Sequence, residues 1–289
     1  MGLLGFNSIG KSIEDAGSFH YQYFYKSSTP SAGAARYFID CNQTSGQPKY
    51  NPFAGSELTA TPLVGSGNSG IYCGTFEVEK SKFISKITLN QSNTTAASPN
   101  FIFLNDYLMF YPLIDCDNLD AQIMDNTNTL PRYQGGEGVR IVLVGTAPMT
   151  SIVSVTVTYT NSDGVSGRTS TADIIPSTAI GVCATAAGSG GTTSQSTPFW
   201  PLADGDKGVR SIESIQFAAS AGGFLCACLV KPITQIMSYE DNVPVESQSG
   251  FSILNPPQIY EGAYLNFLIF RGGGGSPLNI QGEIIFINS

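Results

Sequence analysis

The sequence is poor in charge and almost devoid of histidine. Its 289 residues include 14 Lys and Arg and 22 Asp and Glu, or 12% of the chain, against roughly 25% in an average soluble domain. A charge-rich disordered chain is excluded, because 42% of the residues are hydrophobic and 11% are aromatic. The net charge of -8 repels phosphate backbones and no basic run offsets it, so we expect no nucleic-acid partner.

Long apolar runs are also missing. The longest, Phe101–Leu104 and Leu225–Val230, are far shorter than the about 20 residues of a membrane-spanning helix, so we expect no membrane partner. Met1–Phe6 has neither the basic start nor the apolar stretch of a secretory signal, which predicts maturation in the cytoplasm. In that reducing compartment the six cysteines are interpreted as buried apolar side chains: Cys41, Cys73, Cys116, Cys183, Cys226 and Cys228.

What the sequence does contain is the alternation typical of β-strands. Val153–Thr160 alternates apolar residues with serine or threonine, and a turn-forming cluster leads from it into the β-prone stretch Gly167–Ile175, which predicts a hairpin. Gly223–Val230 and Tyr264–Phe270 are apolar on both faces and are typical of central or covered strands. Glu283–Ile287 predicts one more strand.

Helical periodicity is never sustained, so we expect only two short helices, at Ser8–Ala16 and Asp117–Met124. The sequence therefore predicts an all-β fold, an antiparallel β-sandwich that is jelly-roll-like with short helices only. We expect an N-terminal arm over residues 1–18 and a sandwich domain over residues 19–289. A division into two subdomains near residues 135–150 stays open, because 136–140 and 205–210 carry a short internal echo that ends in Gly-Val-Arg.

Motifs for catalysis are incomplete. Gly5–Ser12 fits the letters of a phosphate-binding loop, but only four residues precede it where a buried strand is needed, so an arm or short helix is favoured. The one histidine, His20, is interpreted as structural, since a nucleophile needs a base and no G-x-S-x-G elbow is present. Cys226 and Cys228 have no second ligand pair for zinc and are assigned to the core. We therefore expect no enzymatic activity and no cofactor.

Carboxylates leave two alternatives open. Two of the 22 acidic residues that are distant in sequence can pair in a fold, so a polysaccharide hydrolase is one alternative. A hard cation such as Ca²⁺ is the other, with Asp115, Asp117 and Asp120 or Asp204 and Asp206 as its ligands. Neither cluster has the loop of an EF-hand, and turn capping is favoured over metal binding.

Aromatic residues are the more informative excess, with 17 Phe, 13 Tyr and one Trp. An exposed tyrosine joins an apolar ring to a polar tip and suits a protein interface or the stacking of a sugar. Four aromatic residues near the start of the sandwich domain share one face of a predicted strand. They are the interface candidates: Phe19, Tyr21, Tyr23 and Tyr25.

Short motifs follow one another in order along most of the chain. They are Leu130–Tyr133 running into Gly138–Arg140, Thr158–Asn161 with Gly167–Thr169, Pro198–Leu202 running into Gly208–Ile212, and Ile259–Ala263, with Gly5–Asn7 and Leu108–Pro112 fitting the same pattern. In these segments the chain resembles virion structural proteins of tailed bacteriophages. The resemblance brings no catalytic residues.

The resemblance implies a non-enzymatic particle component, a capsid decoration (cement) subunit or another head or tail protein. Its partners would be other virion proteins, the major capsid protein or tail components, and phage decoration proteins suggest a homo-oligomer, a trimer. The protein would be made in the host bacterial cytoplasm and end in the virion. The alternative is a receptor- or glycan-binding module of a phage fibre or tail, for which the tyrosines and the glycine-rich stretches 186–198 and 271–276 argue.

Overall fold

The computed structural model describes residues 19–27, 38–66, 69–93, 100–175, 179–184, 186–187, 197–238, 242–246, 256–270 and 278–288. Within these ranges the chain is built from strands, and its one helical segment is a short 3₁₀ turn at Cys41–Gln43. All pairs of neighbouring strands in the described sheets are antiparallel. The predicted all-β, antiparallel, sandwich-like fold is confirmed.

The strands form three sheets. The terminal sheet has the order β14-β5-β17-β1-β3, with β15 paired to β5. Its strands are β1 (Phe19–Ser27), β3 (Ser45–Gln47), β5 (Lys82–Asn93), β14 (Val245–Glu246), β15 (Gln258–Ile259) and β17 (Leu278–Asn288).

The central sheet has the order β2-β16-β6-β13-β8, with β4 paired to β6. Its strands are β2 (Phe38–Asp40), β4 (Thr61–Pro62), β6 (Asn100–Asp115), β8 (Arg140–Gly145), β13 (Phe224–Ser238) and β16 (Leu265–Phe270). The hairpin sheet has the order β11-β10-β9-β12-β7. Its strands are β7 (Gln122–Ile123), β9 (Val153–Asn161), β10 (Arg168–Ile174), β11 (Ala186–Ala187) and β12 (Val209–Phe217).

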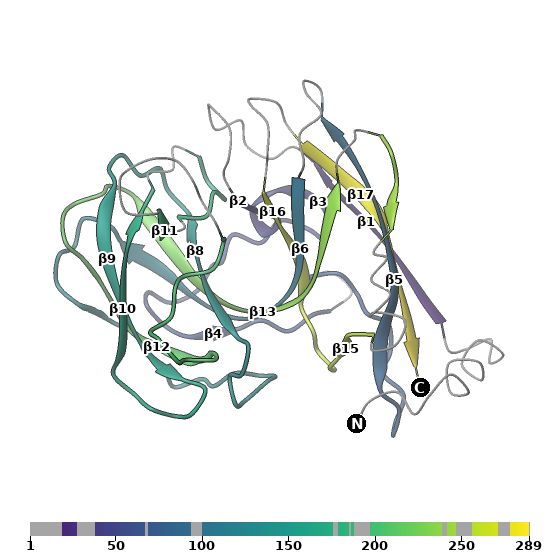
Figure 1. Cartoon of the computed structure of the whole chain (residues 1–289), viewed down its shortest axis with the longest axis horizontal. Coiled ribbons are helices and arrows are strands. Elements are labelled where there is room, and N and C mark those ends of the chain that lie inside the picture. The colour runs from purple at the N-terminus through teal and green to yellow at the C-terminus, as the bar shows by residue number, and fades with distance from the viewer. Residues whose placement is uncertain are drawn as a thin grey trace.

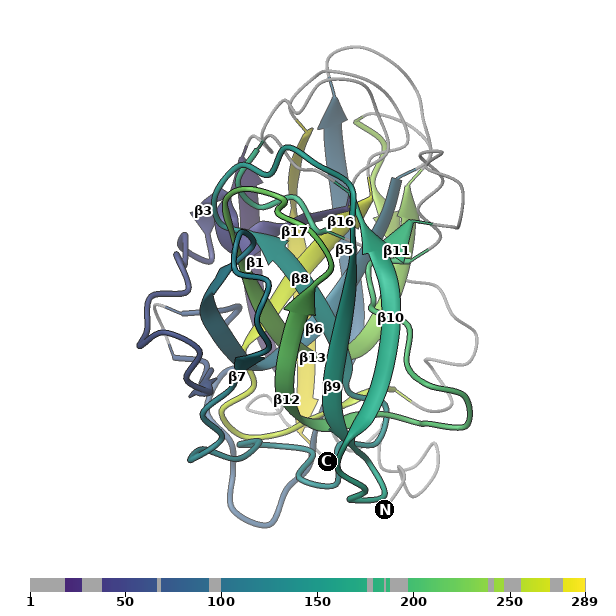
Figure 2. The same cartoon turned by 90° about the vertical axis from the view of Figure 1, so that its left-hand side faces the viewer.

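The long strands β6 and β13 join the two ends of the molecule. They pair along almost their whole length, with three register shifts, and Figure 1 shows them running between the hairpin sheet at one end and the terminal sheet at the other. Figure 2 looks onto the hairpin sheet, where β9 lies between β10 and β12. Both end sheets therefore pack against one shared central sheet.

Three hydrophobic clusters hold this arrangement together. The first joins the hairpin sheet to one half of the central sheet, with Val155 and Val157 packed among residues such as Tyr111 and Leu229. The second joins the terminal sheet to the other half through residues such as Ile284, Phe286 and Phe267. The third lies on the opposite face of the central sheet, where Phe53 and Leu63 pack among sheet residues such as Phe110.

The strand predictions correspond to observed strands. β9 alternates buried and half-buried side chains as predicted, and it forms the expected hairpin with β10. The two apolar stretches lie in β13 and β16, each flanked by strands on both sides. All six cysteines are free and buried, as predicted. No helix in the described ranges is long and apolar enough to cross a membrane.

The predicted helix at Asp117–Met124 is wrong. This stretch forms a turn followed by β7, which pairs with β12. The side chain of Gln122 accepts from the Asp115 amide and donates to the Asp115 carbonyl, both at 2.8 Å. The Gln122 side chain is thus bound to the backbone at the end of β6, which favours the turn over a helix.

The predicted arm at residues 1–18, the helix Ser8–Ala16 within it and the phosphate-loop match lie outside the described residues. The division near residues 135–150 stays a prediction. In the structure this stretch contains β8, which pairs with β13.

Candidate interaction face

The interface candidates lie on the outer side of the terminal sheet. β1 alternates between its two faces, so Phe24 and Lys26 are buried while Tyr21, Tyr23 and Tyr25 point outward with 54%, 69% and 44% of their surface exposed. Phe19 is partly buried and stacks on Tyr21 with ring centroids 6.3 Å apart. The structure therefore places the four aromatic residues in one row along a single strand.

The strand register extends this row across the sheet. Tyr21 is paired with Ile285, Tyr23 with Glu283 and Tyr25 with Gln281 of β17. The same three residues of β17 are paired on their other side with Lys86, Thr88 and Asn90 of β5. We call this surface the tyrosine face: Tyr21, Tyr23, Tyr25, Gln281, Glu283, Ile285, Lys86, Thr88 and Asn90.

The tyrosine face carries little charge, with one acidic residue, Glu283, and one basic residue, Lys86. A shallow pocket of about 480 Å³ lies on it beside Tyr23, Tyr25 and Glu283. Within this pocket the Thr88 Oγ1 and Asn90 Oδ1 atoms are buried and have no hydrogen-bond partner among the described residues. The face thus combines exposed rings with polar atoms whose hydrogen bonds are not yet made.

A buried lysine fixes β1 from beneath. The Lys26 Nζ atom donates to the carbonyls of Thr44 at 2.9 Å and Pro48 at 2.7 Å. Burial lowers the pKa of Lys26, against the attraction of Cys41 and Asp40. Because this anchor lies on the inner side of β1, the alternating tyrosines are held on the outer side.

His20 lies on the inner side of the same strand. Its ring meets Tyr72 edge-on at 5.3 Å and lies 6.1 Å from the ring of Phe286. Burial lowers the pKa of His20, and the nearby charge of Lys82 lowers it further. The His20 Nε2 atom has no hydrogen-bond partner in the described part of the chain. The ring therefore packs between aromatic neighbours.

The structure does not gather the carboxylates proposed for a cation. Among the described residues, no three His, Cys, Asp or Glu side chains are close enough to hold a metal ion. Asp115 Oδ1 accepts from the Asp117 amide at 2.9 Å, while Asp117 accepts from Ser220 and from the Gly222 amide. Those two bonds lower the pKa of Asp117. The Asp120 amide donates to Asn118 Oδ1. Asp115 and Asp117 therefore cap turns.

Asp206 is instead the centre of a hydrogen-bond network. Its carboxylate accepts from Tyr159 Oη at 2.7 Å, Asn161 Nδ2 at 2.7 Å and Arg168 Nε at 3.0 Å. Burial alone would raise the pKa of Asp206, but these bonds outweigh it and the pKa is lowered. Asp204 takes part only through its carbonyl, which accepts from Arg168. Asp206 thus connects the two sequence motifs Thr158–Asn161 and Gly167–Thr169.

The partners of the tyrosines were not predicted from sequence. The sequence predicts only the last part of β17, which carries Gln281, Glu283 and Ile285. It does not predict β5, which carries Lys86, Thr88 and Asn90. The alternation of polar and apolar residues between Lys86 and Gln91 is the sequence signal that could have predicted β5. The register that brings the three strands together is not encoded by alternation. The glycine-rich stretches lie mainly outside the described residues.

Comparison with known proteins gives no family. No family model matches the sequence, and no curated protein matches it. Among solved structures, the chain aligns with a mutant VP2 protein of infectious bursal disease virus in T=1 particles, at 9% identity over 94% of this chain and 79% of that chain, with a TM-score of 0.19. Another T=1 particle structure derived from that virus gives 8% identity, the same coverage and the same TM-score. Alignments this weak carry no argument about fold or function.

Proposed function

We propose that the protein is a non-enzymatic structural subunit of a tailed-bacteriophage particle, a capsid decoration (cement) protein. In this proposal the tyrosine face binds across neighbouring subunits of the major capsid protein. The proposal rests on the sequence resemblance described above and on the chemistry of this face. The protein would be made in the host cytoplasm and retained in the virion.

The tyrosine face is the observation that carries the proposal. Three exposed rings lie in a row on an antiparallel sheet, and tyrosine is enriched among the residues that dominate the energy of interfaces. Only Glu283 and Lys86 are charged among the nine residues of the face, so little desolvation opposes its burial. A surface of this kind supports a broad contact with another protein.

A particle-binding assay tests this contact. Particles lacking the protein are incubated with the purified wild type or with a Tyr21→Ser/Tyr23→Ser variant, and the bound protein is measured after sedimentation. Serine is polar and small, so it removes the ring while leaving the solvated side of β1 polar. We expect at least a tenfold loss of binding, because each buried interface tyrosine contributes about 1–2 kcal/mol.

Tyr50→Ser provides the matched control, because Tyr50 is 51% exposed and lies outside the sheet. Circular dichroism confirms that all three proteins fold. Unchanged binding of the double variant contradicts the proposed contact. Binding of the wild type to host cells, with none to the particle, would favour the receptor-binding alternative instead.

A further inference from the structure

The two loops that echo each other in sequence lie side by side. Glu137 forms an antiparallel bridge with Gly208, and the Gly138 amide donates to the Lys207 carbonyl at 3.0 Å. A Cβ atom on Gly208 would collide with the Gly136 carbonyl oxygen, so glycine is required for the loops to approach this closely. The close contact between the two loops is therefore part of the fold.

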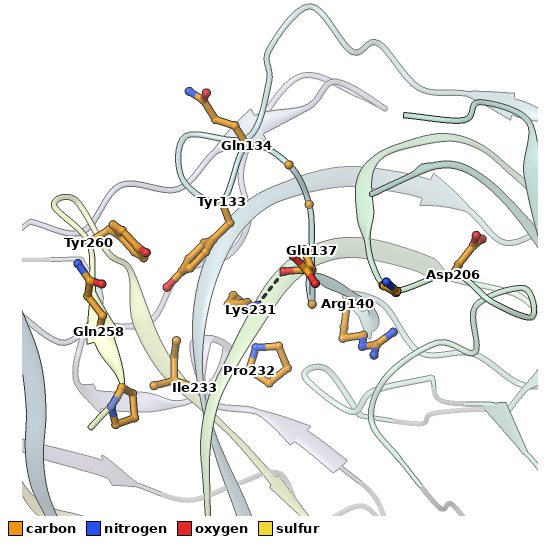
Figure 3. A pocket seen from close by; sticks show the side chains of 15 residues that line it. Tyr133, Gln134, Glu137, Arg140, Asp206, Lys231, Pro232, Ile233, Gln258 and Tyr260 are labelled. Atoms are coloured by element: carbon orange, nitrogen blue, oxygen red, sulfur yellow. Dashed lines mark hydrogen bonds between the residues drawn. The ribbon is translucent and has the colours of Figure 1, made fainter. Parts of the chain in front are cut away.

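An open pocket of about 940 Å³ lies beside these loops, as shown in Figure 3. This volume is within the range of small-molecule sites in proteins. One side of the pocket is aromatic and apolar, and the other carries charged side chains. The apolar side is made by Tyr133, Tyr260, Pro232, Ile233 and Pro257, and the charged side by Lys231, Arg140, Lys207, Glu137 and Asp206.

The charged side is basic, although the chain as a whole is acidic. Asp206 is already bound to Arg168, which leaves Glu137 to face three cations. Lys231 donates to the Glu137 carbonyl at 2.7 Å, not to its carboxylate. The side chains of Arg140 and Lys207 make no hydrogen bond or ion pair with another described residue. Positive charge is thus in excess over negative charge at this end of the pocket.

Lys231 is held at the boundary between the two sides. Its Nζ atom lies 5.4 Å from the centroid of the Tyr133 ring, and a Cβ atom on Gly138 would occupy the place of that Nζ atom. Burial lowers the pKa of Lys231; the charge of Glu137 opposes this effect and that of Arg140 adds to it. An anion beside Lys231 and Arg140 would relieve both the burial and the repulsion.

The aromatic side offers rings and hydroxyls together. Tyr133 meets Tyr260 edge-on, with centroids 5.0 Å apart at 84°. In the described part of the chain, neither hydroxyl has a hydrogen-bond partner. The side-chain amides of Gln134 and Gln258 also line the pocket. Ring faces next to hydroxyl and amide groups are suited to a sugar ring, whose faces are apolar and whose rim carries hydroxyls.

A peptide fits this pocket less well. The main-chain amides of the 136–139 loop are used inside the protein, since Gly136 donates to Tyr133, Gly138 to Lys207 and Val139 to Gly136. An extended peptide gains affinity by adding its backbone to an open strand edge, and this loop offers none. Recognition here must come from side chains.

We propose that this pocket binds an acidic sugar, with a pyranose ring against Tyr133 and Tyr260 and its carboxylate between Lys231 and Arg140. This site is separate from the tyrosine face and does not depend on the particle contact proposed above. The ligand class is a uronic-acid saccharide.

Isothermal titration calorimetry tests the site with galacturonic acid and hyaluronan oligosaccharides, a neutral galactose oligosaccharide and a short Asp/Glu peptide as probes. We expect at least one uronic-acid probe to bind, the neutral sugar and the peptide not to bind, and affinity to fall as salt rises. Lys231→Met and Arg140→Met should each weaken binding at least tenfold, and Tyr260→Ala should weaken it as well.

Lys49→Met is the matched control, because Lys49 is exposed and does not line the pocket. Circular dichroism and the particle-binding assay should be unchanged in the pocket variants, which separates this site from the proposed function. Absence of uronic-acid binding by the folded wild type overturns the inference, as does preferential binding of the acidic peptide. Equal binding by Lys231→Met and the wild type also overturns it.

Discussion

At the scale of single residues, two acidic side chains, Asp106 and Asp40, are completely buried. Asp106 is fully buried and forms a two-pronged ion pair with Arg132, whose Nε and Nη2 atoms lie 2.9 and 2.6 Å from its oxygens. Arg132 also donates to the carbonyls of Leu63 and Tyr107. This single side chain therefore ties the loop after residue 130 to β6 and to the segment around residue 63.

Removing the arginine should destabilise the fold strongly. Arg132→Met leaves the Asp106 carboxylate buried without its counterion, and we expect the free energy of unfolding to fall by about 3–5 kcal/mol. Urea unfolding at pH 7 measures this loss. Combining it with Asp106→Asn, which keeps an acceptor for the Tyr264 amide, should restore part of the loss. A loss below about 1 kcal/mol would show that the pair is not the anchor inferred here.

Asp40 predicts a pH dependence of stability. Its carboxylate is completely buried, which raises its pKa to about 6 despite hydrogen bonds from Asn42 and Tyr107. Between about pH 4 and pH 6 the folded protein therefore holds a proton that the unfolded chain has released, so this group's contribution to stability falls as pH rises through that window.

The comparison is made with Asp40→Asn, which cannot ionise. From pH 4 to pH 6.5, the free energy of unfolding of this variant should rise relative to the wild type by about 2–3 kcal/mol, and the difference should then level off. Urea titrations at a series of pH values measure it. A difference between the two proteins that does not vary with pH would refute the raised pKa.

At the scale of elements, alternation of apolar and polar residues predicts some of the strands that have one wet and one dry face. Val153–Thr160 has this pattern and forms β9, while the helix prediction for Asp117–Met124 is wrong because Gln122 and Asp115 bind nearby backbone groups. The tyrosine row of β1 was also predictable. Its neighbours on β17 and β5 were not, because pairing register depends on contacts between strands distant in sequence.

The meeting of the two echoed loops gives a prediction at this scale. Gly208→Ala places a Cβ atom against the Gly136 carbonyl, and we expect the free energy of unfolding to fall by about 1–3 kcal/mol. Gly135→Ala is the control in the same structure, because a Cβ atom there meets no atom within 4 Å. Thermal or urea unfolding of the two variants is the measurement. Equal stabilities would mean that the loops tolerate separation.

At the scale of the whole molecule, two end sheets share a central sheet through β6 and β13. The sequence predicts the all-β class, since apolar periodicity of two residues is local. The sequence does not predict that the two end sheets share the central sheet. β6 and β13 each pack against both end sheets, and the residue pattern of such a strand is the same as that of one long strand covered by a single sheet. Low charge and exposed tyrosines indicate an interaction surface only once the structure shows that they lie on one face.

Assembly is the next prediction at this scale. We propose a symmetric homo-oligomer, a trimer, by analogy with phage decoration proteins. Sedimentation equilibrium should then give three times the chain mass of 30.6 kDa. A mass equal to one chain across the accessible concentration range would rule out a stable trimer in solution.

The location of the protein on an intact particle is the most direct test of the central claim. Electron cryomicroscopy of purified phage should show density for this chain in many copies over the shell lattice, with the terminal sheet and its exposed tyrosines facing the major capsid protein. Density confined to the tail tip, or no density on the particle, would contradict a role as a capsid decoration subunit.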